Sequence, residues 1–423
     1  MYTTIRLRNV RAWADSGDIA LAPLTLFYGA NGAGKSSIAQ ALDALARIAD
    51  RGFTDPAALV AALPADAVRD MIRDRDPTRL IGIDLAWQPD ASMQAALVQG
   101  ARRLAVSVEL GLDPAGRPRL HGLHWTVTDR ADRPLRVVAV HDGHPVDKDA
   151  AAIDVLAAAT AAAVGGFVML GPLRARPRRS YAVPARVPAD VGPRGQGAVP
   201  AMAAADRAGR RLSIGDGAAR GFADMISDRL ATLGLVAGVD LVDAPGGVAL
   251  IARGRRGGQA PFAEAGFGLS QVLPAAVAAF LVPAGSTLWL EQPELHLHAA
   301  AQAALGDLLI DALEAREAGR ARHLQILVET HSEPLLNRIQ RRIAEARLAA
   351  DRVAVHWCPG TVPATIERLE MDETGEILNW PDDVFGDEMA DVTARAVAAA
   401  ARRKARRAGE GEGEGEGGGE GGA

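Results

Sequence analysis

The chain has 423 residues, 48% of them hydrophobic, and a net charge of −5. This length predicts two or three domains, and the apolar fraction is ample for a sizeable core. The negative net charge excludes a general attraction to nucleic acid or to an anionic membrane, although it allows local basic patches. The single cysteine, Cys358, excludes an intramolecular disulfide and fits a reducing, cytoplasmic location.

The first part of the chain mixes short strands with helices. The alternation of apolar and polar residues predicts strands at 3–10, 18–21, 24–28, 80–87 and 103–110 and a helix at 36–48. Residues 151–170 are mainly alanine, which is too weakly apolar to span a membrane. We therefore expect a buried helix there, followed by a short strand at 167–170. The proline- and glycine-rich segment 174–200 predicts an extended loop.

A regular alternation of helices and strands returns near residue 269. Just before it, a Pro-Gly-Gly turn predicts a hairpin of strands 239–242 and 247–252. The elements that follow are helices 269–281, 299–315 and 333–346 and strands 287–290, 324–328, 353–356 and 366–371. Continuous apolar strands between helices indicate a buried, largely parallel sheet and hence an α/β fold.

The end of the chain changes character. Residues 376–408 are expected to form a C-terminal helical segment, with an alanine- and arginine-rich helix at 397–407. Residues 409–423 are a Gly/Glu repeat with almost no hydrophobic side chain. Such a segment cannot offset its chain entropy, so we expect it to be disordered.

The segment 29–36 matches the phosphate-loop pattern G-x-x-x-x-G-K-[ST] in full. It lies between a predicted strand and a predicted helix, so loop N–H groups and the helix N-terminus converge where phosphates would sit. Lys35 is expected to reach the β- and γ-phosphates, and the Ser36 hydroxyl to ligate Mg²⁺. The predicted ATP-binding residues are Gly29, Ala30, Asn31, Gly32, Ala33, Gly34, Lys35, Ser36 and Ser37.

A carboxylate, Glu291, ends the hydrophobic strand at 287–290. The C-terminal ends of buried parallel strands meet at one edge of a sheet, so we expect Glu291 to lie beside the phosphate loop. There it is predicted to hold Mg²⁺, which is the Walker B role.

Residues 290–298, Leu-Glu-Gln-Pro-Glu-Leu-His-Leu-His, resemble the acidic block of the RecF/SMC/OLD-like ABC ATPases. The segments 9–13, 266–274 and 329–332 resemble three further blocks of that group. Segments 171–174 and 375–381 resemble markers of a stand-alone subgroup with a C-terminal domain of unknown function.

The resemblance implies an ABC/SMC-like P-loop NTPase head with a mixed, mainly parallel sheet. It implies that the head is split between residues 1–55 and 236–375, and that residues 56–235 form an inserted α/β lobe or lid.

The resemblance also implies how such heads work in pairs. Gly266, Gly268 and Ser270 would bind nucleotide held by the opposite head, so an ATP-dependent homodimer is expected. His331 would be the switch histidine near the γ-phosphate. The family pattern has a glutamate where this chain has Gln292, which cannot accept a proton. Losing a general base costs a factor of about 10²–10⁴ in rate, so we expect slow hydrolysis, with Glu294 as a substitute.

Other interpretations compete at individual residues. An acidic and histidine cluster could hold a catalytic metal through His296 and His298, but no third ligand has a characteristic spacing. The cluster consists of Glu291, Glu294, His296, His298, Glu329, His331 and Glu333. Two arginine-rich clusters could contact nucleic-acid phosphates, but a solvated face is favoured for each. The clusters are Arg174, Arg176, Arg178 and Arg179, and Arg402, Arg403, Lys404, Arg406 and Arg407. The glutamine that couples Mg²⁺ to the lid has three weak candidates, Gln88, Gln94 and Gln99.

The resemblance implies a role in genome maintenance or anti-phage defence. Two functions stay open: an ATPase that responds to DNA or RNA, and an ATP-gated scaffold that regulates a partner toxin or nuclease. A transporter motor is less favoured, because no membrane span is evident. The OLD relatives append a nuclease-type domain to the head, and too few residues follow Met371 for one here.

Overall fold

The computed structural model describes residues 1–51, 62–89, 100–141, 144–145, 150–381, 397–399 and 402. The chain divides into two units, Met1–Leu378 and Asn379–Ala423. Helix is described at 397–399 and 402. The rest of the predicted helix at 397–407 and the whole tail at 409–423 lie outside the described residues, so those expectations stay predictions.

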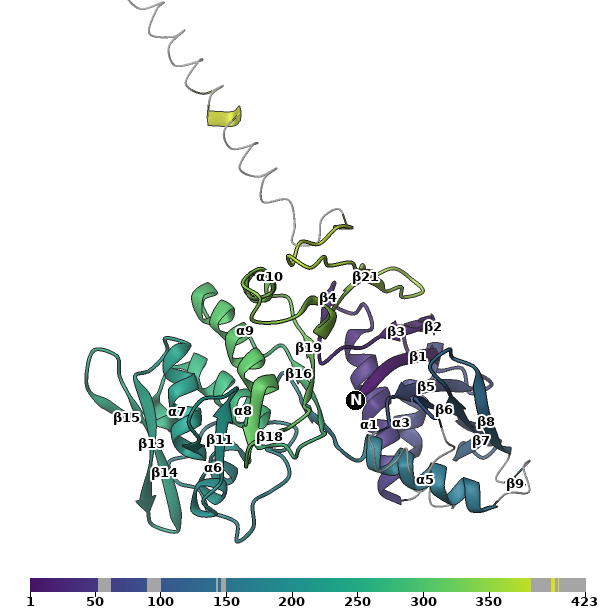
Figure 1. Cartoon of the computed structure of the whole chain (residues 1–423), viewed down its shortest axis with the longest axis horizontal. Helices are drawn as coiled ribbons and strands as arrows, with labels where there is room; N and C mark the ends of the chain where they lie inside the picture. Colours follow the sequence, from purple (N-terminus) through teal and green to yellow (C-terminus); the bar gives the residue numbers. More distant parts are fainter. Residues whose placement is uncertain are drawn as a thin grey trace, which may run out of the picture. The chain divides into compact units, whose positions relative to one another are not determined.

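The central element is a mainly parallel sheet (Figure 1). Its strands, in spatial order, are β10 (Phe167–Leu170), β16 (Thr287–Glu291), β19 (Gln325–Glu329), β4 (Leu24–Gly29), β20 (Val353–Cys358) and β21 (Glu367–Leu369). All neighbours run parallel except β21, which is antiparallel to β20. Every residue of β4 and β19 is buried, as their continuous apolar runs predicted. The predicted α/β fold class is therefore confirmed.

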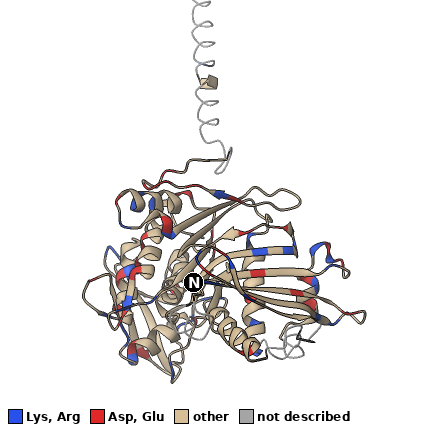
Figure 2. Cartoon of the chain, turned by 45° about the vertical axis from the view of Figure 1, so that its right-hand side comes forward, with Lys and Arg blue, Asp and Glu red and all other residues tan. Residues whose placement is uncertain are grey.

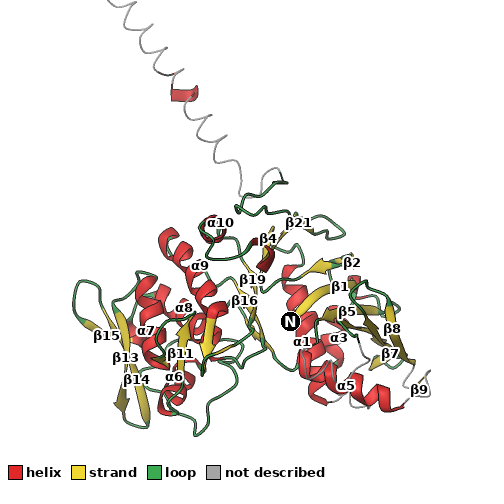
Figure 3. Cartoon of the chain, viewed as in Figure 1, coloured by secondary structure: helices red, strands yellow, loops and turns green. Residues whose placement is uncertain are grey.

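Helices follow the strands of this sheet, and α8 and α9 lie against β16 and β19 (Figure 3). The helices are α1 (Lys35–Arg51), α5 (Ala150–Val164), α8 (Phe267–Leu281), α9 (Ala299–Glu314) and α10 (Glu333–Ala344). Side chains cap two of them: His298 Nδ1 accepts from the Ala301 N–H at the start of α9, and Ser332 Oγ accepts from the Leu335 N–H at the start of α10. No described helix is long and apolar enough to cross a membrane.

A second, antiparallel sheet packs against α1 and α5. Its strands are β2 (Trp13–Asp15), β1 (Tyr2–Val10), β5 (Ile81–Trp87), β6 (Arg103–Leu112), β7 (Pro118–Thr128), β8 (Pro134–His141) and β9 (His144–Pro145), with β3 (Ile19–Ala20) paired to β1. Buried residues alternate along β6, which is the pattern of a sheet with one covered face. Trp125 donates to Thr160 of α5 at 2.8 Å inside this core. Figure 2 shows both signs of charge on these strands.

Two smaller sheets and several helices complete the unit. The strands are β11 (Arg211–Ile214), β12 (Arg220–Gly221), β17 (Ala315–Glu317) and β18 (Arg320–Ala321) in one sheet, and β13 (Gly238–Ala244), β14 (Gly247–Arg253) and β15 (Gln259–Pro261) in the other. The further helices are α3 (Ala65–Met71), α6 (Ala198–Arg207) and α7 (Phe222–Thr232), with 3₁₀ turns at Arg73–Arg75, Phe262–Glu264 and Ala350–Arg352. The predicted hairpin at 239–252 corresponds to β13 and β14.

The strands between residues 56 and 235 do not form a sheet of their own. β5 pairs with β1, and β10 forms an edge of the parallel sheet beside β16. The expected inserted lobe is thus continuous with both large sheets in the described part of the chain. Strand partners are long-range, so composition alone does not reveal them. The split-head boundaries stay a proposal.

Candidate functional site

The loop after β4 needs glycine at two positions. Gly29 has φ +137°, and a Cβ there would lie 2.0 Å from the Cys358 carbonyl oxygen of the neighbouring strand. Gly34 has φ +92°, and a Cβ there would lie 2.8 Å from Trp13 Nε1. That indole donates to the Gly34 carbonyl at 3.1 Å. The loop is thus held between β20 and the end of the antiparallel sheet, with α1 beginning at Lys35.

Lys35 turns its ammonium group into this loop. Nζ donates to the Gly29 and Ala30 carbonyls at 2.9 and 2.8 Å, and its side chain is 2% exposed. Glu329 Oε1 lies 3.8 Å from Nζ. Burial lowers the pKa of Lys35, and the charge of Glu329 opposes that shift. A desolvated cation therefore lies where the loop motif places a phosphate.

Two carboxylates meet at the Ser36 hydroxyl. Ser36 Oγ lies 3.2 Å from Glu291 Oε1 and 2.8 Å from Glu329 Oε2. The parallel register of β16 and β19 puts Glu291 directly beside Glu329. A hydroxyl has one hydrogen, so it can satisfy only one of the two carboxylates at a time. Burial raises the pKa of both glutamates, and the Glu329 charge further raises the pKa of Glu291.

Glu291 lies where its place at a strand end predicted. Glu329 was expected as the first residue of the His331 block and as a member of the alternative acidic and histidine cluster, but not beside Ser36. Its position between Ser36 and Lys35 depends on β19 lying between β16 and β4, and this strand order is not visible in the chain order. A buried strand ending in a carboxylate, the same signal that identified Glu291, was present at Glu329 as well.

The predicted catalytic residues surround the same strand ends. Gln292 has φ +44° and donates its N–H to the Glu329 carbonyl at 2.7 Å. Glu294 is buried, and its Oε1 accepts from the His331 N–H at 2.8 Å. Burial raises the pKa of Glu294 and lowers that of His331, which the Lys35 charge lowers further. Both effects favour the neutral imidazole of His331.

Arg174 is buried beside this site, which corrects its assignment to a solvated arginine face. Its Nη2 donates to the Glu291 carbonyl at 3.3 Å, and the residue is 8% exposed. Burial lowers the pKa of Arg174 to about 10, against the charges of Glu291 and Glu294. Arg176, Arg178 and Arg179 are exposed. One feature of the sequence could have indicated the position of Arg174: the segment 171–174 directly follows the predicted strand at 167–170.

The predicted signature segment begins α8. Gly266 is the N-cap, Ser270 Oγ donates to the Phe267 carbonyl at 2.7 Å, and a Cβ on Gly268 would lie 3.4 Å from the His296 carbonyl oxygen. Phe267 is 72% exposed, and its ring centroid lies 5.4 Å from that of His296. Within the described residues, no hydrogen bond joins this segment to the phosphate loop. Its action on a partner's nucleotide stays a prediction.

The alternative residues are placed elsewhere. His298 caps α9 and His296 faces Phe267. The described part of the chain has no group of three or more His, Cys, Asp and Glu side chains able to hold a metal ion. Gln88 donates its N–H to the Met1 carbonyl at the end of β5, whereas Gln94 and Gln99 lie outside the described residues. In the second arginine cluster only Arg402 is described.

Two segments of the chain match models of protein families. Residues 4–46 match a family described as "AAA domain", and residues 220–337 match one described as "AAA domain, putative AbiEii toxin, Type IV TA system". The first segment contains the phosphate loop, and the second contains Glu291, Glu329 and His331. No curated protein matches the chain.

Solved structures similar to this chain include SMC heads. The SMC head domain from Thermotoga maritima is 13% identical, covers 88% of this chain and 99% of its own, and has a TM-score of 0.43. An SMC head bound to the C-terminal winged-helix domain of ScpA is 14% identical, with 88% and 98% coverage and a TM-score of 0.48. An SMC head with an extended coiled coil, bound to the C-terminal domain of ScpA from Pyrococcus furiosus, is 12% identical, with 87% and 96% coverage and a TM-score of 0.46.

The geometry and the family models agree on the kind of protein. One matched segment supplies the phosphate loop, and the other supplies the strand ends that meet it at Ser36. These two segments are therefore similar to domains of the AAA families, and together they carry the phosphate loop and the strand ends of the candidate site.

Proposed function

We propose that this protein binds ATP with Mg²⁺ through residues 29–37 and hydrolyses it slowly. The observation that carries the proposal is the meeting of Lys35, Ser36, the half-buried Glu291 and the buried Glu329 at one sheet edge. The loop supplies N–H groups and an ammonium group for phosphate oxygens. The carboxylates are anionic, so they would not bind the phosphate itself. They would hold the cation that accompanies it.

The donor set fits Mg²⁺. Ser36, Glu291 and Glu329 offer hard oxygen atoms, which this ion prefers. Burial raises the pKa of both glutamates, and the Glu329 charge further raises the pKa of Glu291, so a bound cation would stabilise both carboxylates in their charged form. When bound, Mg²⁺ neutralises charge on the phosphates. We thus propose Glu329 as a metal ligand in addition to Ser36 and Glu291.

The catalytic set is Gln292, Glu294 and His331. Gln292 can orient a water molecule but cannot take its proton. Glu294 has a raised pKa, which suits a base, and its contact with the His331 backbone holds that residue beside the strand ends. Neutral His331 can accept or donate a hydrogen bond near the terminal phosphate.

Turnover of purified protein tests this set. We expect wild-type hydrolysis to be slow and Gln292→Glu to raise kcat by about 10²-fold, because a general base typically contributes 10²–10⁴-fold. Glu294→Gln should lower the remaining activity. Fast wild-type turnover that Glu294→Gln leaves unchanged would contradict the proposal.

The paired state is proposed to close around ATP through Gly266, Gly268 and Ser270 of each copy. The exposed Phe267 supports this arrangement. An apolar ring that is 72% exposed at the start of a helix is costly in water and is suited to burial against a second copy.

The biological role proposed is anti-phage defence or genome maintenance. The family description that matches residues 220–337 names a toxin of a toxin–antitoxin system, which supports the defence role and an ATP-gated scaffold for a partner toxin or nuclease. Copurification of partner chains with and without ATP separates the scaffold from an ATPase that responds to nucleic acid. A partner held in only one nucleotide state supports the scaffold, and turnover stimulated by DNA or RNA supports the other function.

A further inference from the structure

The long segment 171–197, between β10 and α6, has no regular structure but is firmly tied. Its two arms are joined where the Gly171 N–H donates to the Pro193 carbonyl and the Ala175 N–H to the Arg194 carbonyl, at 2.9 and 2.8 Å. Its middle is joined to β14 by paired backbone bonds between Tyr181 and Val248. Loops longer than about 15 residues are uncommon in compact domains and are usually functional.

This loop encloses a cavity of about 280 Å³ against the 3₁₀ turn Phe262–Glu264 and the first turns of α8. Arg176, Arg178 and Arg194 line it, and no aspartate or glutamate does. None of the three arginines forms an ion pair with a described residue. The cavity therefore concentrates positive charge in a chain whose net charge is −5.

The carboxylates near the cavity are already engaged. Glu264 pairs with Arg179 at 3.0 Å, and Asp190 accepts from the Gly192 N–H at 2.7 Å within its own turn. They therefore do not neutralise the lining guanidinium groups. Guanidinium groups bind phosphate oxygens through paired, charge-assisted hydrogen bonds.

Tyr181 adds an aromatic wall to the same cavity. Its hydroxyl accepts from the Arg178 N–H at 2.7 Å, which fixes the side chain in place. Arginines beside an aromatic side chain are the combination that binds a phosphate while a base stacks. The volume suits one nucleotide unit and is too small for a duplex.

We propose that the cavity enclosed by the segment 171–197 binds the phosphate of a nucleotide, either free or within a single strand, as a second site distinct from the phosphate loop. Ser270 of the predicted signature segment also lines the cavity. The test must therefore exclude nucleotide held by a partner's phosphate loop.

The experiment uses full-length Lys35→Ala protein, in which the phosphate loop of each copy is expected to bind nucleotide at least about tenfold more weakly. Fluorescence anisotropy measures binding of a labelled thymidine oligonucleotide and of a labelled adenosine monophosphate at low and high salt. In this background Arg176→Ala/Arg178→Ala/Arg194→Ala should weaken binding by at least about tenfold, because three charge-assisted contacts are lost. Affinity should also fall as salt rises.

The matched control removes the same charge outside the cavity. Arg186→Ala/Arg255→Ala/Arg256→Ala replaces three exposed arginines, the first of them in the same loop, and should leave affinity within about twofold. Binding of the monophosphate identifies a free nucleotide as the ligand, and binding of the oligonucleotide alone identifies a strand.

Absence of binding by both probes, or an equal loss in the two triple variants, would overturn the proposal. If the first variant does not fold, Arg176→Gln alone should give a smaller loss in the same direction. Failure of this site is distinguishable from failure of the ATPase proposal, because ATP binding to the phosphate loop is measured separately in protein with Lys35 intact.

Discussion

At the scale of single residues, the site is made of charged side chains that have too few oppositely charged or hydrogen-bonding partners. Glu291, Glu329 and Glu294 are all partly or wholly buried, and burial raises the pKa of each. Lys35 and Arg174 are the cations that face them, and burial lowers the pKa of both. Carboxyl groups with raised pKa values beside basic groups with lowered pKa values are typical of functional sites. Stability of the fold alone would favour apolar residues at such buried positions.

Glu329→Gln tests the role of the second carboxylate. We expect the Mg²⁺-dependent part of ATP affinity to fall by at least about tenfold, since a charged metal ligand is lost. ATP binding measured in EDTA should change much less. Calorimetric titrations with Mg²⁺ and with EDTA provide both values, and a variant with unchanged Mg²⁺ dependence would remove Glu329 from the metal site.

The same substitution should stabilise the nucleotide-free protein at neutral pH. The folded-state pKa of Glu329 is raised, so the native carboxyl group holds its proton more tightly than the unfolded one. Stability is therefore lost as pH rises through the raised pKa, and Gln avoids that loss. The gain in Tm should be present at pH 7 and vanish below the unfolded pKa of about 4.3. A lower Tm at pH 7 would contradict this sign.

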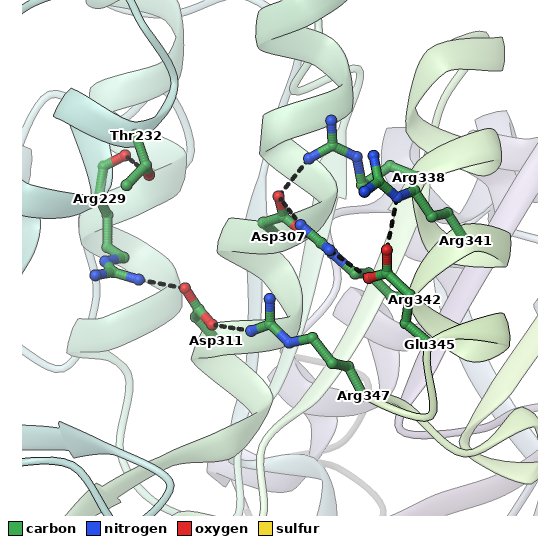
Figure 4. Close-up of polar contacts among 9 residues, drawn as sticks. All are labelled: Arg229, Thr232, Asp307, Asp311, Arg338, Arg341, Arg342, Glu345 and Arg347. Atoms are coloured by element: carbon green, nitrogen blue, oxygen red, sulfur yellow. Dashed lines mark hydrogen bonds and ion pairs between the residues drawn. The ribbon is translucent and has the colours of Figure 1, made fainter.

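At the scale of elements, ion pairs join three helices behind the site (Figure 4). Asp311 on α9 accepts from Arg229 of α7 and from Arg347, which follows α10. One turn earlier, Asp307 accepts from Arg338 and Arg342 of α10. These contacts tie the helix that follows Glu291 to the helix that follows His331, so both strand ends are held in register.

Asp311→Ala should destabilise the fold by about 1–3 kcal/mol, because it leaves two guanidinium groups without their shared carboxylate. The Asp311 side chain is 8% exposed, so water cannot replace it fully. Unfolding in guanidinium chloride measures the change in the free energy of unfolding. Glu345→Ala, which removes an exposed carboxylate of the same cluster, should leave the midpoint nearly unchanged. Equal effects of the two substitutions would refute a special role for the buried pair.

Local patterns predicted the elements of this site well. Apolar runs placed β16 and β19 within one residue of their bounds, and the loop motif placed the start of α1. The position of Glu291 could be predicted because the C-terminal ends of the strands in a parallel sheet lie at the same edge as the phosphate loop. The contacts of Glu329 and Arg174 could not be predicted, since they depend on which strands are neighbours, although Glu329, like Glu291, ends a predicted apolar strand. The pairing of β5 with β1 was hidden for the same reason.

At the scale of the whole molecule, two copies of the chain are proposed to close around ATP. Phe267→Asp should weaken the ATP-dependent dimer by at least about tenfold, since it puts a charge into a buried apolar contact. Val362→Asp is the matched control, because Val362 is 95% exposed and belongs to the loop between β20 and β21 rather than to α8. Sedimentation velocity with and without ATP measures the dimer. A wild-type protein that is monomeric with ATP and Mg²⁺ would contradict the paired state.

The central claim is that Lys35, Ser36 and the surrounding loop hold the phosphates of ATP. Calorimetric titration of folded wild-type protein and of Lys35→Ala with ATP and Mg²⁺ tests it most directly. We expect saturable heat from the wild-type protein and an affinity at least about tenfold weaker in the variant, because a charge-assisted phosphate contact is lost. Wild-type protein that releases no heat, or a variant that binds equally well, would contradict the account.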